Sequence, residues 1–393
     1  MSTEGPSHLT AGEKLRYGAE AAGFFFLMGI FKILGLDAAS ALGGFIGREI
    51  LYRTPISERA RENLRAAYPE KNADEIEAIV RGMWDNLGRT VGEYPHLDKI
   101  SSRRPKARIE LLNVERAEAA AAPGKGVFFF SGHFGNWEVM PAAAAEHGFE
   151  GATVYRPVNN PYVDRWIVAQ RLKAGSTEMV TKGPQGTRRI FTLLRRGKAA
   201  FLLVDQKTNE GVAAPFFGQD AMTTPAPAGL ALRMGAALVC ISNERLKGAR
   251  FRMRVNPAIR FTPTGNYDED VRALTARINR EIEECVREHP SQWLWIHRRW
   301  PRAKDKPTGR RALAAQAALG VASRVERDGS SWCRLLALRF CVSGRFCADA
   351  AAPASVLNRT VLNRAVLSRT GPFMTGLLNP NAGRCFTRTP RFF

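Results

Sequence analysis

Short apolar runs alternate with stretches of helical periodicity along the middle of the chain. The runs predict strands near residues 108–113, 126–131, 151–155, 199–204, 236–242 and 250–256. Apolar residues at helical spacing predict helices near 137–147, 160–174, 184–196, 226–234 and 267–288. This alternation indicates an α/β fold in which helices flank a mixed sheet.

Two further helices are predicted before the first strand. Asn72 and Glu75 have the spacing of a capping box, and apolar residues follow at helical intervals from Ile76 to Val91. An earlier, more basic helix opens at Ser57 and ends at Pro69.

The N-terminal part of the chain contains two apolar segments, at residues 21–31 and 38–46. Each is short for a spanning helix, and basic residues lie on both sides. We therefore expect residues 1–54 to form an interfacial or hairpin membrane anchor on the cytoplasmic face. A signal peptide cleaved near Ala39-Ser40-Ala41 is the competing interpretation. The signal-peptide interpretation is less favoured because the first apolar segment begins only at residue 21.

The composition changes after about residue 303. Residues 303–393 contain 15 Lys and Arg against 4 Asp and Glu, and no lysine follows Lys306. Four of the six cysteines lie here, at spacings that match no zinc or redox signature. The remaining two, Cys240 and Cys285, have the pattern of isolated core thiols. We expect a compact domain over 55–302 and a basic tail of low order over 303–393.

The formal net charge of +21 requires acidic partners. Anionic lipid headgroups, phosphorylated substrates, an acidic carrier protein and nucleic acid all satisfy this requirement, so charge alone does not choose among them. The hydrophobic content of 45% is enough for a large core.

The candidate chemistry centres on a turn after the strand near 126–131. His133 precedes Glu138 by five residues, Gly132 and Gly135 break the strand, and Asn136 is a plausible cap for the next helix. A neutral imidazole held by a carboxylate can take a proton from an alcohol, as acyl transfer to a hydroxyl requires. The alternative is a structural histidine whose hydrogen-bonding groups are satisfied within the turn.

Polar residues follow other strands as well. Arg156 comes directly after the strand near 151–155, and Arg171 lies on the helix after it. Arginines in such positions can bind phosphate or carboxylate. Asp205 and Gln206 follow the strand near 199–204 and could orient a substrate, or Asp205 could form an Asx turn. No metal-ligand spacing is present.

Several segments in this order resemble the late acyltransferases of lipid A biosynthesis, the lauroyl/myristoyl transferase family within the glycerolipid acyltransferase superfamily. The resemblance covers roughly residues 15–302. It is carried by Gly132 to Glu138, Tyr155-Arg156-Pro157, Asp205-Gln206, Pro215 to Gly218 with Thr223, and Gln292 to Trp300.

The resemblance implies a direct transfer without cofactor or metal. His133 would deprotonate a hydroxyl on a phosphorylated glycolipid, and Glu138 would hold and polarise His133 as the acid member of the dyad. Turn amides near Asn136, or Arg171, would supply oxyanion donors. Arg156 and Arg171 would contact the phosphate or the carrier. Asp205, Gln206 and Asn136 are further candidate substrate contacts.

The family also implies partners and a location. The acyl donor would be an acyl-acyl-carrier protein or acyl-CoA, and the protein would work at the cytoplasmic face of the bacterial inner membrane. Two alternatives stay open at this stage. The acceptor could be another glycolipid, such as a mannoside, or a lysophospholipid. A non-enzymatic, basic membrane- or nucleic-acid-binding protein would also account for the charge, but no nucleic-acid module is recognisable, so we expect no nucleic-acid partner.

Overall fold

A computed structural model describes residues 9–121, 125–208 and 211–300. Its helices are α1 (Ala11–Leu34), α2 (Leu36–Glu49), α3 (Ile56–Ala67), α4 (Ala73–Glu93), α5 (Val114–Ala120), α6 (Met140–Glu146), α7 (Pro161–Ala174), α8 (Pro184–Arg195), α9 (Ala226–Met234) and α10 (Tyr267–Glu288). Its strands are β1 (Ile109–Leu112), β2 (Val127–Ser131), β3 (Gly151–Tyr155), β4 (Glu178–Thr181), β5 (Ala199–Leu203), β6 (Val212–Phe216), β7 (Gln219–Thr223), β8 (Ala237–Arg245) and β9 (Phe251–Val255). The tail predicted over 303–393 lies outside the described residues.

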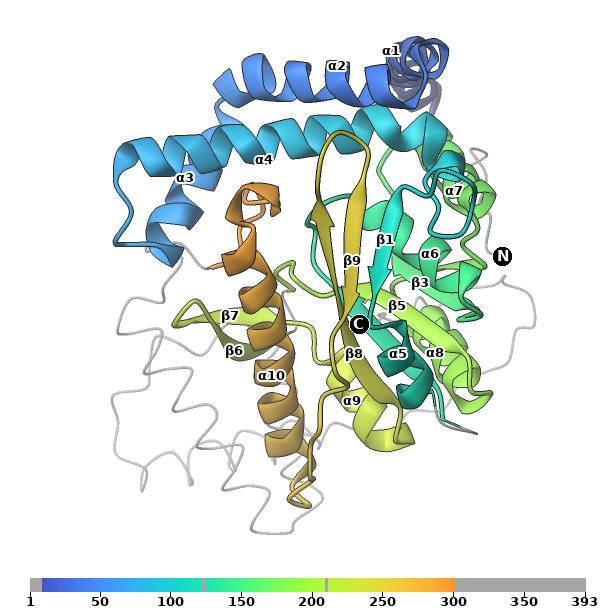
Figure 1. Ribbon diagram of the computed structural model, residues 1–393, viewed down its shortest axis with the longest axis vertical. Helices are drawn as coiled ribbons and strands as arrows, with labels where there is room; N and C mark the ends of the chain where they lie inside the picture. Colours follow the sequence, from blue (N-terminus) through green and yellow to red (C-terminus); the bar gives the residue numbers. More distant parts are fainter. Residues whose placement is uncertain (1–8, 122–124, 209–210, 301–393) are drawn as a thin grey trace, which may run out of the picture. The chain divides into compact units, whose positions relative to one another are not determined.

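A seven-stranded sheet organises the fold, with the strand order β1-β9-β8-β2-β5-β3-β4 (Figure 1). Every neighbouring pair is parallel except β8 and β9, which are antiparallel. The carboxyl ends of β2, β5, β3 and β4 therefore lie at one edge of the sheet. The fold is the mixed α/β arrangement that the sequence predicts.

Strand β2 is buried on both faces, as expected for a strand in the centre of a parallel sheet. Phe128 and Phe130 pack into a core with residues of α8, α9 and α10, whereas Val127 and Phe129 pack on the opposite side with residues of α5 and α6. This alternation follows from the two-residue period of a strand. It explains why β2 is an uninterrupted apolar run.

Helix α4 crosses one end of the sheet, and α2 is stacked along it (Figure 1). The capping box predicted at Asn72 and Glu75 is formed and begins α4. Ala39 and Ser40, the predicted cleavage site of a signal peptide, lie within α2 and are fully buried. Cleavage there would cut through the packed interior, which argues against the signal-peptide alternative.

Helix α1 leaves a large apolar surface uncovered. Phe26 is 74% exposed and Ile33 is 88% exposed, while Phe24 packs against Trp166 of α7. Within the part of the chain that the structure describes, α1 is the one helix long and apolar enough to cross a membrane, by length and composition.

The predicted main elements are confirmed, and α9 and α10 begin and end where the helical periodicity does. Pro141 lies in the first turn of α6, where its missing N–H needs no partner. A separate 3-10 turn at Trp137–Val139 precedes it. Three features were not predicted: α5, β4 and the β6–β7 hairpin.

The β6–β7 hairpin escapes prediction because its sequence lacks the usual turn signal. Phe217 and Gly218 connect the strands, and both have positive φ. A two-residue hairpin turn of this kind usually contains Asn-Gly or Asp-Gly, since a bulky residue rarely adopts positive φ. Pro215 within β6 also weakens the strand pattern.

Helices α2 and α4 meet backbone to backbone. A Cβ atom added at Gly88 would lie 2.1 Å from the carbonyl oxygen of Gly43, and one added at Gly43 would lie 2.2 Å from that of Gly88. Neither backbone can retreat without separating the helices. Glycine at these two positions therefore sets the distance between α2 and α4.

We predict that Gly88→Ala destabilises the protein by about 1–3 kcal/mol, because overpacking forces the two helices apart. Gly29→Ala on α1 is the matched control, since nothing lies within 4 Å of its Cβ position. The control should be neutral or slightly stabilising, as alanine favours a helix over glycine. Urea denaturation in detergent measures both variants. Equal midpoints for the two would contradict this account of the interface.

Candidate active site

The pairing of β2 with β5 brings two polar residues together. Ser131 at the end of β2 lies opposite Leu203 at the end of β5, and His133 and Asp205 each follow two residues later. Because both strands run in the same direction, the two side chains emerge at the same edge of the sheet.

Asp205 holds His133 through two hydrogen bonds. Its Oδ1 lies 2.7 Å from Nδ1 of His133, and its Oδ2 accepts the backbone N–H of His133 at 2.7 Å. Trp293 Nε1 donates to the same Oδ2 at 2.7 Å. Burial alone would raise the pKa of Asp205, but the charge that His133 carries when it is protonated and these hydrogen bonds outweigh the effect of burial and hold the pKa well below its usual value. Asp205 is therefore a carboxylate acceptor, and Nδ1 of His133 carries a proton.

This arrangement corrects the predicted pairing of His133 with Glu138. Both oxygens of Glu138 accept hydrogen bonds from Arg171, at 2.6 and 2.8 Å, and one also accepts from Trp137 Nε1. Glu138, in the 3-10 turn at Trp137–Val139, bonds to Arg171 of α7, whereas Asp205, two residues after β5, lies beside His133. The acid on His133 is Asp205, for which the sequence predicts either a substrate contact or an Asx turn.

The Glu138–Arg171 pair is nearly buried, with the Glu138 side chain 5% exposed and that of Arg171 17% exposed. Burial would raise the pKa of Glu138, but Arg171 lowers it below the usual value. The pair occupies the Nε and Nη2 edge of the Arg171 guanidinium, one of the edges through which a phosphate could bind with two hydrogen bonds. The phosphate contact predicted for Arg171 would therefore have to use another edge of the guanidinium while this ion pair is intact.

A pocket of about 160 Å³ opens beside His133. Besides His133 it is lined by polar and aromatic residues from the strand ends and α7, including Trp137, Glu138, Tyr155, Arg156, Arg171, Lys182 and Gln206, and by apolar residues such as Met140, Phe201 and Leu203. Arg156 and Lys182 are neighbours because Tyr155 pairs with Thr181 in the parallel β3–β4 register. Burial and the charge of Arg156 lower the pKa of Lys182. This corner of the pocket is electropositive.

Gln206 and His297 complete the polar surroundings of His133. Gln206 Nε2 lies 3.2 Å from Nε2 of His133 and 3.1 Å from Nε2 of His297. Sequence reasoning identified Gln206 but gave no role to His297 or Lys182. The strand-end position of Lys182 was a usable signal once β4 was recognised. His297 lies in the segment from Gln292 to Trp300, which carries part of the family resemblance, but its contact with Gln206 has no local sequence signal because the segment is about 160 residues from His133 along the chain.

Asn136 is fully buried and does not line the pocket. Its side-chain oxygen caps the 3-10 turn by accepting the N–H of Glu138, and its Nδ2 donates to Glu93 at 2.8 Å. The predicted capping role is correct. The structure gives no support to the predicted substrate contact of the side chain, because both ends of its amide form hydrogen bonds inside the protein.

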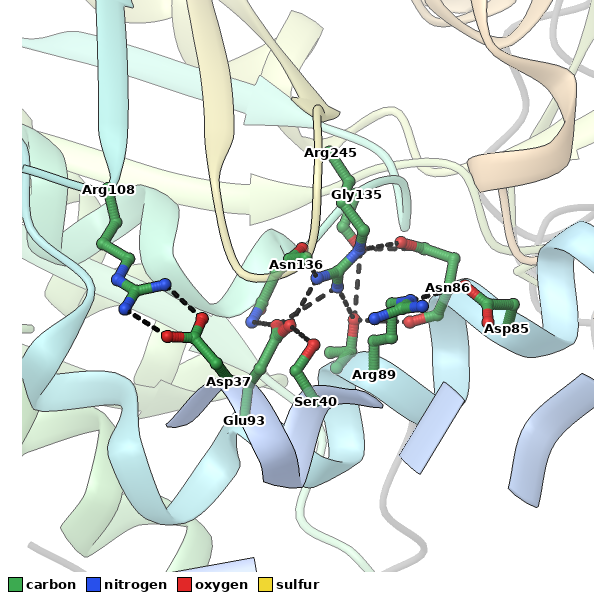
Figure 2. A network of polar contacts seen from close by, with 12 residues as sticks. Asp37, Ser40, Asp85, Asn86, Arg89, Glu93, Arg108, Gly135, Asn136 and Arg245 are labelled. Atoms are coloured by element: carbon green, nitrogen blue, oxygen red, sulfur yellow. Dashed lines mark hydrogen bonds and ion pairs between the residues drawn. The ribbon is translucent and has the colours of Figure 1, made fainter. Parts of the chain in front are cut away.

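Glu93 belongs to a buried network that fixes the His133 turn (Figure 2). Glu93 is 0% exposed, pairs with Arg245 of β8, and accepts a hydrogen bond from Ser40 of α2 at 2.7 Å. Arg245 also donates to Asn86 Oδ1 at 2.7 Å, and Asn86 Nδ2 donates to the carbonyl oxygen of Gly135 at 2.9 Å. The network thus joins α2, α4, β8 and the turn.

Gly135 permits this turn to form. It has φ +58°, and a Cβ at this position would lie 2.4 Å from the carbonyl oxygen of Asn243. Asn243 in turn donates to the carbonyl oxygen of Asn136 at 2.6 Å. A larger residue at 135 would break the contact with β8.

The chemistry that this geometry supports is proton abstraction at the pocket. With a proton on Nδ1, the neutral imidazole of His133 presents a lone pair on Nε2, and Asp205 stabilises the imidazolium that forms when this lone pair takes a proton. Among the residues described, no group of three or more His, Cys, Asp or Glu could hold a metal ion.

Comparison with known proteins gives a consistent picture. The family model described as bacterial lipid A biosynthesis acyltransferase matches residues 7–302. The chain is 27% identical to the lipid A biosynthesis palmitoleoyltransferase of Escherichia coli K12 over 258 residues, covering 65% of this chain and 80% of the relative. It is 25% identical to the lauroyltransferase of the same organism, covering 63% and 78%. A phosphatidylinositol mannoside acyltransferase of Mycolicibacterium smegmatis is 22% identical, covering 74% and 95%.

We predict that Glu93→Gln destabilises the fold by about 3–5 kcal/mol, because it leaves the Arg245 charge buried without a counter-charge. Glu110→Gln is the control, since the pair of Glu110 with Arg252 is well exposed and should contribute less than about 1 kcal/mol. Equilibrium unfolding in denaturant compares the two. If both variants unfold at the wild-type concentration of denaturant, the network does not hold the structure as described.

Proposed function

Because the chain belongs to the bacterial lipid A biosynthesis acyltransferase family and is therefore an acyltransferase, we propose that it transfers a fatty acyl chain to a hydroxyl of a lipid A precursor, with His133 as general base. The observation that carries this proposal is the hydrogen bond of 2.7 Å between His133 Nδ1 and Asp205, beside a pocket that His133 lines. It leaves a lone pair on Nε2, which Gln206 contacts in this structure, to receive the proton of the attacking hydroxyl when the acceptor binds.

The reaction is a direct transfer in a ternary complex. The acceptor oxygen attacks the thioester carbonyl carbon of the donor while its proton passes to His133 Nε2, and the carbonyl electron pair moves to oxygen. The tetrahedral intermediate then re-forms the carbonyl, the C–S bond breaks, and the leaving sulfur takes the proton from His133. Asp205 steadies the imidazolium between the two steps.

No protein nucleophile is needed for this route. The sequence lacks a Gly-x-Ser-x-Gly motif, and Cys240 and Cys285 are buried in the core. The donor is an acyl-acyl-carrier protein or acyl-CoA. In both donors the acyl group is bound as a thioester to the sulfur of a carrier, and both carriers are anionic.

Arg156 and Lys182 are the proposed contacts for an anionic group of the substrate. They lie side by side at the ends of β3 and β4 and line the pocket that contains His133. A phosphate there would relieve the repulsion between the two cations. Glu138 and Arg171 shape the same pocket as an internal ion pair. In this assignment Glu138 acts through Arg171 and Trp137 rather than through His133.

The apolar surface of α1 supports attachment to a membrane. Phe26 and Ile33 are exposed, Lys14 and Arg16 precede the apolar segment, and Lys32 lies at its end. We assign residues 1–54 to the anchor and place the catalytic domain, residues 55–302, at the cytoplasmic face of the inner membrane. A lipid acceptor would reach the pocket without leaving the membrane surface.

A second candidate acceptor is a mannoside-bearing phospholipid. The similarity to the mycobacterial phosphatidylinositol mannoside acyltransferase extends over 298 residues, more than the 258 matched in the palmitoleoyltransferase. Incubating the purified protein with one acyl carrier and either a lipid A precursor or a phosphatidylinositol mannoside distinguishes the two. Mass spectrometry of the products identifies the acylated lipid.

We predict that His133→Ala abolishes acyl transfer while the protein stays folded, because the base is lost. Asp205→Asn should lower kcat by about 10²–10⁴-fold, because a neutral amide cannot stabilise the imidazolium. The N–H₂ group of the amide would also face the N–H donors of His133 and Trp293, which now donate to the carboxylate. Steady-state kinetics with a labelled acyl donor measures both variants.

Asp220→Asn, on the exposed part of β7, is the matched control and should retain full activity. Circular dichroism and the melting temperature confirm folding of each variant. Full turnover by the His133→Ala variant would end the proposal.

We predict that the KM for the anionic substrate rises with ionic strength, because salt screens the attraction to Arg156. Arg156→Gln should raise KM by about 10-fold at low salt, the effect of one charged hydrogen bond, and flatten the dependence on salt. Arg165→Gln, exposed on α7, is the control and should preserve the wild-type slope. A KM independent of salt in the wild type would contradict an electrostatic contact here.

A further inference from the structure

The side-chain amide of Gln206 lies between two histidines. Its Nε2 is within 3.2 Å of His133 Nε2 and within 3.1 Å of His297 Nε2, and the two imidazole rings are 5.7 Å apart. Gln206 also lines the pocket. One N–H₂ group therefore touches the nitrogen that acts as base in the proposed reaction.

The positions of the hydrogens follow from Asp205. A carboxylate only accepts, so Nδ1 of His133 must be the protonated nitrogen, and Nε2 of the neutral ring must be an acceptor. Gln206 therefore directs its N–H₂ group, not its oxygen, at His133. The second N–H of that group is directed at Nε2 of His297. This nitrogen must therefore be unprotonated and accept the hydrogen bond through its lone pair.

His297 is well suited to remain neutral and fixed. Burial and the nearby His133 lower its pKa, so the ring keeps a lone pair at neutral pH. Its backbone is anchored, because Asn63 Nδ2 donates to the carbonyl oxygens of His297 and Trp295, each at 2.6 Å. Gln206 is therefore held by a rigid acceptor.

We propose that Gln206 donates a hydrogen bond to the oxyanion of the tetrahedral intermediate, and that His297 is a positioning residue that orients the Gln206 amide. This inference rests on the proposed function. When the acceptor hydroxyl binds, it takes over Nε2 of His133 and releases one N–H of Gln206. That N–H lies beside the oxygen that attacks, and hence beside the carbonyl oxygen that gains the electron pair.

The other donors suggested by the sequence are less well placed. Arg171 Nε and Nη2 donate to Glu138, and the side chain of Asn136 is buried and donates through Nδ2 to Glu93. Neither Gly135 nor Asn136 lines the pocket. The Gln206 N–H is a pocket-lining donor that already contacts the base.

The test is a kinetic double-mutant cycle on the full chain, with a labelled acyl donor. Gln206→Met keeps the side-chain size and removes the donors without adding charge. We expect kcat to fall by about 10²–10³-fold, the usual effect of losing one oxyanion donor, with KM nearly unchanged. His297→Ala should lower kcat in the wild type but cause no further loss in the Gln206→Met background, because it acts through Gln206.

Gln219→Met is the matched control, since Gln219 is exposed on the β6–β7 hairpin and bonds only to a backbone oxygen. It should leave kcat unchanged. Melting temperatures separate loss of activity from loss of fold, and Gln206→Ala serves as a second variant if the methionine disturbs packing.

Three results would overturn the inference. They are a kcat for Gln206→Met close to that of the wild type, a loss confined to KM, and losses for His297→Ala that multiply with those of Gln206→Met. The His133→Ala variant separates the two levels of argument. If it is inactive while Gln206→Met is fully active, the base survives and only the oxyanion assignment fails. If His133→Ala is itself active, the proposed function fails.

Discussion

The ion pair between Glu93 and Arg245 is the constraint on which the rest of the site depends. Removing two charges from water is costly, and the cost is offset only if every remaining hydrogen-bonding group is satisfied. Ser40, Asn86 and Asn136 satisfy them, and they come from α2, α4 and the turn after β2. Four separate segments must therefore assemble together before the pair is stable, and the turn that bears the histidine is shaped by the same event.

Parallel strand pairing then brings the polar residues of the site together. Side chains that follow the ends of adjacent parallel strands emerge side by side, which is how His133 meets Asp205 and how Arg156 meets Lys182. In the proposed reaction the first pair transfers a proton and the second binds an anionic group of the substrate. The sheet separates the two tasks by placing them on different strand pairs, β2–β5 and β3–β4, around one pocket.

Local signals were sufficient to predict most of the fold. The capping box at Asn72, the periodicity of α10 and the apolar run of β2 are each contained in a few neighbouring residues. The acid partner of His133 could not be found in this way. The spacing of five residues and the family resemblance both predict Glu138, whereas Asp205 lies 72 residues from His133 and becomes its neighbour only once β5 is known to pair with β2. The buried network and His297 depend in the same way on tertiary contacts.

The contact between α2 and α4 ties the N-terminal region to the interior of the domain. Gly43 and Gly88 touch through their backbones, and Ser40 reaches the interior beside Glu93. Helix α2 is therefore part of the packed interior rather than an appendage to it. A truncation that removed α2 would take away the packing partner of Gly88 and one hydrogen bond to Glu93, so the frame around the turn after β2 would be weakened.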